Sequence, residues 1–220
     1  MTIHSHYPRG SKDTNHCIVQ NCRVTCDDAP FFGEFEREII QATTDAESNC
    51  GSIILTLNNA MFQNCTLPGH WLSSIRVNIN ELEIVGGNLR TIHPETFQSQ
   101  FGGNIRVLVL ENVIINTLAA ETFLGLSNLE GLHIKDCEFI NIRHNALQAI
   151  DDTLQVLNIK AVNHWDPVNI TGSSDLRQLR VIDFSNNHFA DILGKNSFSN
   201  IKNCKVLFLN SCNINSIGAG

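Results

Sequence analysis

The chain has 220 residues, of which 42% are hydrophobic, so it is long and apolar enough to bury one sizeable core. Its 22 acidic and 15 basic side chains give a formal net charge of -7, which argues against a general nucleic-acid binder, because such proteins need a basic surface. The sequence has no apolar run of about 18 residues or more, so we expect no membrane span in this chain.

The chain begins with a polar, histidine-containing leader, residues 1–16, which we expect to be disordered. Its first ten residues lack the apolar core of a signal peptide. Two interpretations follow: a signal was removed before this numbering begins, or the protein stays inside the cell. We predict no catalytic or metal-binding role for the leader's histidines.

Residues 17–51 lack the apolar phrase that repeats through the rest of the chain, and they contain four clustered cysteines: Cys17, Cys22, Cys26 and Cys50. We predict a disulfide-bonded cap that covers the first repeat, with Ile39 and Ile40 among its apolar residues. Four cysteines allow three pairings, and the residues alone do not choose among them. Zinc is the alternative, but the spacing is not that of a recognised finger, so we predict no metal site.

Residues 52–220 repeat one apolar phrase with a stride of about 25 residues. The clearest copies are Leu129-x-x-Leu132-x-Ile134, Leu179-x-x-Ile182-x-Phe184 and Cys204-x-x-Leu207-x-Leu209. The copies start at Ser52, Ile79, Ile105, Leu129, Leu154, Leu179 and Cys204. This period predicts about seven repeats of an α/β leucine-rich-repeat solenoid, with a curved parallel β-sheet on its concave side and irregular or short helical segments on its convex side.

Each repeat starts with Leu-x-Leu alternation, the period of a strand whose alternate side chains point into a core. Apolar residues at the eleventh and fourteenth positions then continue to fill that core, and a further apolar anchor follows at Phe97, Phe123 and Leu147. Phe198 comes one residue late, which predicts an insertion in the loop over residues 191–197.

The last repeat ends at Gly220, before its expected anchor. No repeat buries its apolar face alone, so an uncovered last repeat would expose its core to water. We therefore expect an array that is truncated at the C-terminus, or one whose end is covered by a partner.

The repeat of about 24 residues with a trailing phenylalanine, Ile105-x-x-Leu108-x-Leu110 through to Phe123, resembles the extracellular leucine-rich repeats of Toll-like receptors, Slit-type guidance proteins and insect adhesion receptors such as chaoptin. The resemblance covers residues 17–220 and implies the pairs Cys17–Cys26 and Cys22–Cys50. Two departures stand out. The ninth-position asparagine is kept only at Asn187, which predicts a less regular inner turn, and the cap cysteines are more loosely spaced than the usual cluster.

The residues between the buried positions of each strand should face outward and form the ligand-binding surface. A mixed-charge patch on adjacent strands is predicted to contain Glu111, His133, Lys135, Asp136, Asn158 and Lys160. Titration of its histidine would make binding pH-sensitive. Phe208 is predicted to be an outward apolar anchor. The competing interpretations are that the charged face is only solvated surface and that Phe208 packs against a following repeat.

Clustered cysteines favour an oxidising compartment. The tripeptides that begin at Asn64 and Asn169 match the acceptor pattern for N-glycosylation, and we predict both as glycosylation sites. Cys137 and Cys212 occupy the ninth position and should be structural and reduced, while Cys204 replaces a core leucine. Together these features favour a secreted protein or a cell-surface ectodomain.

The fifth repeat breaks its pattern around Trp165. An outward Trp would be a second contact site, since Trp is enriched at interface hot spots. The alternative, which we prefer, is that Trp165 plugs a gap on the convex side.

The function predicted from these observations is non-catalytic recognition of a protein or glycan partner on the concave face. The sequence contains no nucleophile elbow, zinc-protease motif or phosphate-binding glycine loop, so we predict no catalytic residue and no cofactor. Two alternatives stay open. One is a homophilic adhesion or matrix protein that forms a homodimer, and the other is an intracellular leucine-rich-repeat scaffold with reduced cysteines.

Overall fold

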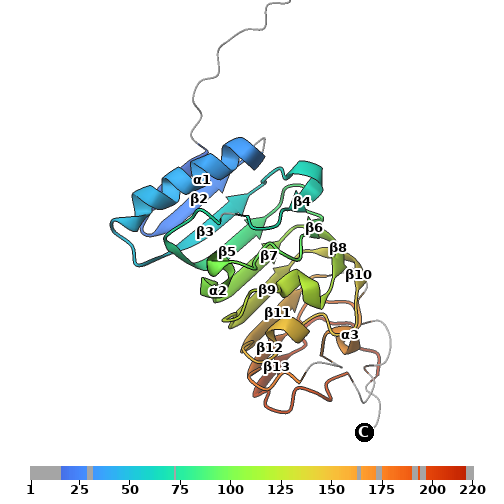
Figure 1. Ribbon diagram of the computed structural model, residues 1–220. Coiled ribbons are helices and arrows are strands. Elements are labelled where there is room, and N and C mark those ends of the chain that lie inside the picture. Colours follow the sequence, from blue (N-terminus) through green and yellow to red (C-terminus); the bar gives the residue numbers. More distant parts are fainter. Residues whose placement is uncertain are drawn as a thin grey trace, which may run out of the picture.

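A computed structural model describes residues 16–28, 32–71, 73–162, 165–171, 175–189, 193 and 197–216. The expected leader therefore lies outside the described residues, except for His16, and so do the last four residues and most of the loop over residues 191–197. The described part is a mixed α/β fold with one large, mostly parallel sheet and few helices (Figure 1).

Nine strands of the described chain form the main sheet, stacked along the length of the molecule in the order β1-β2-β3-β5-β7-β9-β11-β12-β13 (Figure 1). Only the first pair, β1 and β2, is antiparallel. The strands are β1 (Cys17–Gln20), β2 (Arg23–Asp27), β3 (Ser52–Asn58), β5 (Asn78–Val85), β7 (Val107–Glu111), β9 (Gly131–Lys135), β11 (Val156–Lys160), β12 (Val181–Asp183) and β13 (Val206–Phe208). Every predicted repeat strand from β3 onward is present.

Equivalent positions of the repeated phrase lie opposite each other in the sheet. Leu132 on β9 is aligned with Leu108 on β7 and with Leu157 on β11. The same register continues through Ile182 to Leu207. Because side chains alternate along a strand, this register sends every Leu-x-Leu pair to the same side of the sheet.

The core lies between the main sheet and a second wall of short elements. This wall contains the parallel pairs β4 (Thr66–Leu67) with β6 (Thr91–Ile92) and β8 (Ile114–Leu118) with β10 (Glu138–Ile142). Short helices complete it: η1 (Gln63–Cys65), α2 (Gln100–Asn104), η2 (Ala120–Phe123), η3 (Gln148–Ile150) and α3 (Pro167–Thr171). The short strand pairs on this side were not predicted.

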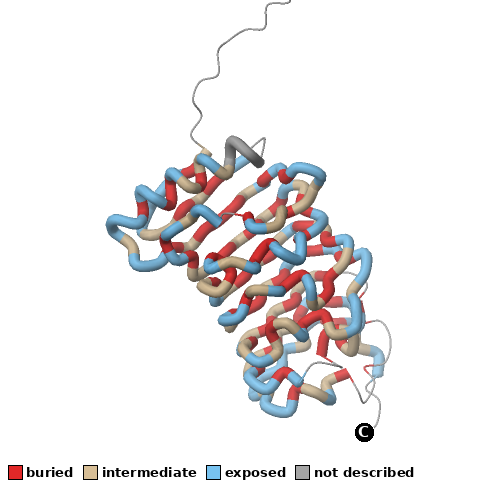
Figure 2. The backbone as a smooth tube through the Cα atoms, viewed as in Figure 1, coloured by how far each residue is buried: buried red, intermediate tan, exposed pale blue. Residues whose placement is uncertain are grey.

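Buried residues recur along the whole stack (Figure 2). Leu89, Ile115 and Leu118, at the eleventh and fourteenth positions, are buried, and so are the anchors Phe97 and Phe123. Each large side chain of this kind contributes about 1.5–3 kcal/mol when it is fully removed from water. The repeated apolar positions therefore supply the main stabilising term of the fold.

The eighth position of every repeat adopts a left-handed backbone conformation with positive φ. These residues are Asn59, Gly86, Asn112, Asp136, Ala161, Asn186 and Ser211. Asn59 and Gly86 donate their backbone N–H groups to the carbonyls of Val85 and Glu111 in the next repeat, at 2.7 and 2.8 Å. The frequent Asn, Asp and Gly at this position match the conformation, since these residues tolerate positive φ best.

The side chain of Asn187, at the ninth position, is buried and bonds four groups around the turn. Its Oδ1 accepts from Val162 N at 2.9 Å and from Trp165 Nε1 at 3.3 Å. Its Nδ2 donates to Ile159 O and Phe184 O. Polar backbone groups that are buried need such partners, so this asparagine fastens two repeats together.

Other residues replace the asparagine where it is missing. Asn88, at the tenth position, accepts from Phe62 N at 2.6 Å and donates to Phe62 O at 3.0 Å, so the turn beside Gly87 is still satisfied. The free thiol of Cys137 donates to Leu110 O at 3.4 Å, and the free thiol of Cys212 donates to Phe184 O at 3.0 Å. Different residues therefore satisfy the backbone groups of the inner turn in different repeats.

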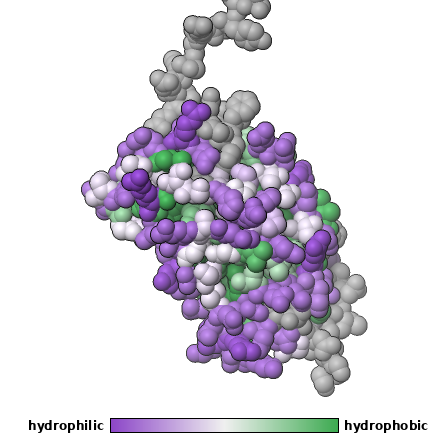
Figure 3. All heavy atoms as spheres, viewed as in Figure 1, coloured by the Kyte–Doolittle hydropathy of each residue, from purple (hydrophilic) through white to green (hydrophobic). Residues whose placement is uncertain are grey.

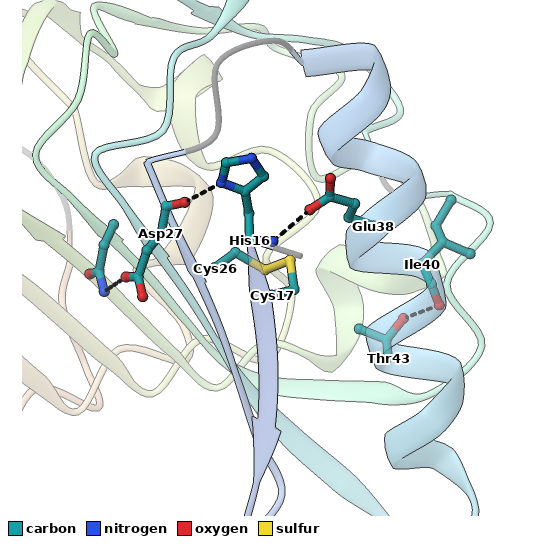
Figure 4. The surroundings of a disulfide bond; sticks show 8 residues. His16, Cys17, Cys26, Asp27, Glu38, Ile40 and Thr43 are labelled. Carbon is teal, nitrogen blue, oxygen red and sulfur yellow. Dashed lines mark hydrogen bonds between the residues drawn. A yellow bond between two sulfur atoms is a disulfide. The ribbon is translucent and has the colours of Figure 1, made fainter. Parts of the chain in front are cut away.

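The N-terminal unit consists of the β1–β2 hairpin and α1 (Phe32–Glu47), which packs against β1, β2 and β3. The disulfides are Cys17–Cys26 and Cys22–Cys50, the pairs that the resemblance implied. Figure 4 shows His16 beside the first of them: its backbone N–H donates to Glu38 of α1 at 3.1 Å. These bonds join both strands, the helix and the following loop into one unit.

The helix α1 was not predicted from the sequence. Over residues 36–47, whose burial is described, its buried residues are Ile39, Ala42, Thr43 and Ala46, which have the i, i+3, i+4, i+7 spacing of a helix. That spacing was the signal that could have identified it.

Trp165 is 8% exposed, so it is not an outward contact site. Its ring packs edge-on against Phe184 and Phe189, with centroid distances of 4.9 and 5.3 Å. The burial of Trp165 agrees with the part of the preferred interpretation in which this side chain plugs a gap.

Candidate functional site

The outward face of the main sheet, which we call the sheet face, carries two aligned rows of side chains. The fifth position of the repeats gives Thr56, Glu83, Val109, His133, Asn158, Asp183 and Phe208, each opposite the next. The seventh position gives Asn58, Val85, Glu111, Lys135 and Lys160 in the same way. The predicted residues other than Asp136 and Phe208 thus lie together on β7, β9 and β11.

His133 is held in one orientation on this face. Its Nδ1 lies 2.7 Å from Nδ2 of Asn158, so the amide donates to Nδ1, and the proton of the neutral ring is on Nε2. Partial burial lowers the pKa of His133, and the charge of Lys160 lowers it further, so the ring is neutral at pH 7. A Cβ atom at Gly131 would lie 3.3 Å from Nε2, which shows that the imidazole occupies space left free by the glycine.

The charged residues of the patch are paired with one another. Lys135 Nζ lies 2.7 Å from Glu111 Oε1 and 3.5 Å from Asp136 Oδ2. The hydrogen bond and charge of Glu111 raise the pKa of Lys135. Lys160 Nζ lies 2.5 Å from Asp183 Oδ2. The patch is therefore close to neutral as a whole, and surface pairs of this kind contribute little to stability.

Asp183 belongs to this patch although it was not among the predicted site residues. Partial burial acts to raise its pKa, but hydrogen bonds from Lys160 and Ser185 outweigh that effect and hold the pKa below its usual value. Its place in the fifth-position row was visible in the sequence, and its pairing with Lys160 follows from the register of β11 and β12.

A second polar cluster, which the sequence analysis missed, lies toward the N-terminal end of the same face. Arg23 of β2 donates to Thr56 Oγ1 at 2.7 Å and to Glu83 Oε2 at 2.5 Å, while the Thr56 hydroxyl also donates to Glu83 at 2.5 Å. Glu81 lies beside Glu83 on β5. Burial, then the hydrogen bond and charge of Glu83, raise the pKa of Glu81 against the opposing effect of Arg23.

Phe208 lies on β13, the last strand of the sheet, and is 43% exposed. Its neighbours Val206 and Leu207 are 40% and 38% exposed. The position of Leu207 is buried in the preceding repeats. Leu207 itself is exposed at the end of the described sheet, where β13 has only one described neighbour, β12. Elsewhere the surface drawn in Figure 3 is mainly hydrophilic with small hydrophobic patches.

Asp136 does not lie in the strand rows. It occupies the eighth-position turn after β9, with a φ of 51°, and reaches the patch only through its 3.5 Å contact with Lys135. The prediction that groups it with the face is therefore corrected: it belongs to the edge at which the strands end.

The two predicted glycosylation sites differ in their surroundings. Asn64 is exposed in the η1 turn. Asn169 is half-buried within α3, and the hydroxyl of its sequon residue Thr171 is buried and bonded to Pro167 O and Ser197 O. A glycan fits the folded surface more readily at Asn64.

Among the described residues, no group of three or more His, Cys, Asp or Glu side chains is arranged to hold a metal ion. In the same part of the chain, no helix combines the length and the apolar character that crossing a bilayer requires. No family model, curated protein or solved structure matches the chain.

Proposed function

We propose that this chain is a leucine-rich-repeat solenoid that acts as a non-catalytic, extracellular recognition module of the receptor-ectodomain type. In this proposal a protein or glycan partner binds the sheet face, which would be the concave face of the solenoid. The observation that carries the proposal is the in-register alignment of outward side chains on consecutive parallel strands.

Such a face suits binding because its side chains are fixed before a partner arrives. The His133 ring is oriented by Asn158, and Lys160 is fixed by Asp183. Binding to a preorganised surface loses less side-chain entropy. The basic nitrogen of His133, Nδ1, is already occupied by the amide of Asn158, so the ring is better placed to donate a hydrogen bond than to remove a proton.

The two disulfides support an extracellular location over the alternative of an intracellular scaffold, since such bonds persist in oxidising compartments. Intact-mass analysis of the protein purified from its native source, before and after reduction, distinguishes these locations. A mass that does not change on reduction would favour the intracellular scaffold.

The recognition function is tested by screening the disulfide-intact chain against panels of extracellular proteins and immobilised glycans with surface plasmon resonance. For each binder, His133→Ala and Lys160→Ala are compared with Lys202→Ala, a matched change of an exposed lysine outside the sheet face. We expect the two face variants to weaken binding about tenfold or more and the control to leave it unchanged. A specific binder that is indifferent to both face variants would contradict the proposal.

A further inference from the structure

A hollow of about 540 Å³ lies along the edge at which β3, β5, β7, β9 and β11 end. It is lined by the residues that follow these strands, including the eighth-position turns. Of the predicted site residues, the hollow contains only Asp136, so it is a separate feature from the strand rows of the sheet face.

Two consecutive glycines create this hollow. Gly86 and Gly87 have φ values of 65° and 81°. A Cβ atom would lie 2.4 Å from Asn59 Oδ1 at the first glycine and 2.2 Å from Ala60 O at the second. At Gly87 a side chain would clash with backbone atoms, and at Gly86 the Asn59 side chain would have to move, so no side chain projects from these two positions into the hollow.

Three of the polar side chains that line the hollow have no partner among the described residues. Arg90, Asn112 and Glu138 are exposed, and within the described residues their side chains have no hydrogen-bond or ion-pair partner. The charged residues of the sheet face, by contrast, are paired with one another. Leu89 and Val113 also border the hollow, but both are buried, and its accessible lining is mainly polar.

We propose that this hollow binds an uncharged carbohydrate, such as the sugar units of a glycan. Sugar hydroxyls both donate and accept hydrogen bonds, and here Arg90 donates, Glu138 accepts and the Asn112 amide does both. The lining contains one cation, Arg90, and two anions, Asp136 and Glu138, so the site disfavours phosphate and acidic sugars. Its volume falls within the roughly 300–1,000 Å³ of small-molecule sites.

The test uses the full chain and ligand-observed NMR with defined probes: maltotriose, mannotriose and triacetylchitotriose, with sialyllactose as the anionic comparison. The variants Arg90→Met, Asn112→Gly and Glu138→Gln each remove one polar function. Glycine retains the positive φ of 53° at Asn112. The matched control is Asn186→Gly, since Asn186 has a φ of 62° in an equivalent turn outside the hollow.

We expect at least one neutral probe to bind at millimolar concentration, each hollow variant to weaken it about tenfold, and the control to change nothing. Binding of no probe would overturn the proposal, as would binding that survives all three variants. Binding that is lost in His133→Ala instead would place the sugar on the sheet face and reject the hollow. If extended peptides occupy the hollow and the sugars do not, the carbohydrate assignment is wrong.

Discussion

Asn158 Nδ2 lies 2.7 Å from His133 Nδ1, so a side-chain hydrogen bond joins β9 and β11 across the middle of the sheet face. This bond requires an unprotonated Nδ1, and the lowered pKa of His133 satisfies that requirement at pH 7. Protonation would place two donors opposite each other and break the contact. The hydrogen-bond geometry and the pKa shift of His133 therefore both predict an unprotonated Nδ1 at pH 7.

The first prediction concerns that pKa. NMR titration of the imidazole should give a value below the usual 6.5, and Lys160→Met should raise it, because the lysine charge is one of its two causes. Lys202→Met is the control. A His133 pKa that does not change when the Lys160 charge is removed would contradict the arrangement of these side chains.

The same shift makes stability depend on pH. Since the pKa of folded His133 lies below the unfolded value, the unfolded state binds more protons, and the free energy of unfolding falls as the pH is lowered through 6.5 toward the folded pKa. Denaturant unfolding of His133→Gln should show a weaker pH dependence than the native chain across that window. Equal slopes for the two proteins would refute the assignment.

The pKa shift of Glu81 is opposite in sign to that of His133. Its pKa is raised in the folded state, so its protonated form is stabilising below the unfolded value of 4.5, and that contribution is lost as the pH rises through the folded pKa. Glu81→Gln keeps a donor for Glu83 and removes the repulsion. We expect a gain of at most about 1 kcal/mol at neutral pH, because solvent screens this partly exposed site, and no gain in acid. Urea unfolding at both pH values checks this, and a loss of stability at neutral pH would contradict it.

Asn187 should be the most sensitive polar residue of the inner turn. Asn187→Ala leaves buried backbone groups of Val162 and Ile159 unpaired, at a cost of about 1–3 kcal/mol. Asn187→Cys should cost less, since Cys137 and Cys212 occupy this position in other repeats. Thermal unfolding measures both, with Asn141→Ala, an exposed change on β10, as control. Equal effects of alanine and cysteine would show that the thiol contacts contribute nothing.

The sequence was sufficient for the parts of this fold that repeat. The phrase that contains Leu132 and Leu157 defined their strands and the side of the sheet to which they point, because a constant period fixes relative position along the whole array. It also brought His133 beside Asn158, since both are fifth-position residues.

The repeat period predicts the positions of residues within the repeats only. Arg23 lies in the cap, which lacks the repeated phrase, so its position relative to the repeat strands could not be predicted. Its contact with Glu83, two strands away, was therefore missed. Asp136 was misplaced because the Leu-x-Leu phrase does not mark where a strand ends, and Asp136 lies one residue beyond β9, in the left-handed turn. The hollow beside Gly86 depends on backbone conformation at two glycines, which the apolar pattern does not report.

The stacking of repeats in register is the basis of the sheet face, and it is tested most directly by interstrand nuclear Overhauser effects in the isotope-labelled chain. We expect backbone proton contacts that link Val109 to His133 and His133 to Asn158, as opposite residues on parallel strands. Contacts displaced by one residue, which would turn His133 into the core, or the absence of contacts between these strands would contradict it.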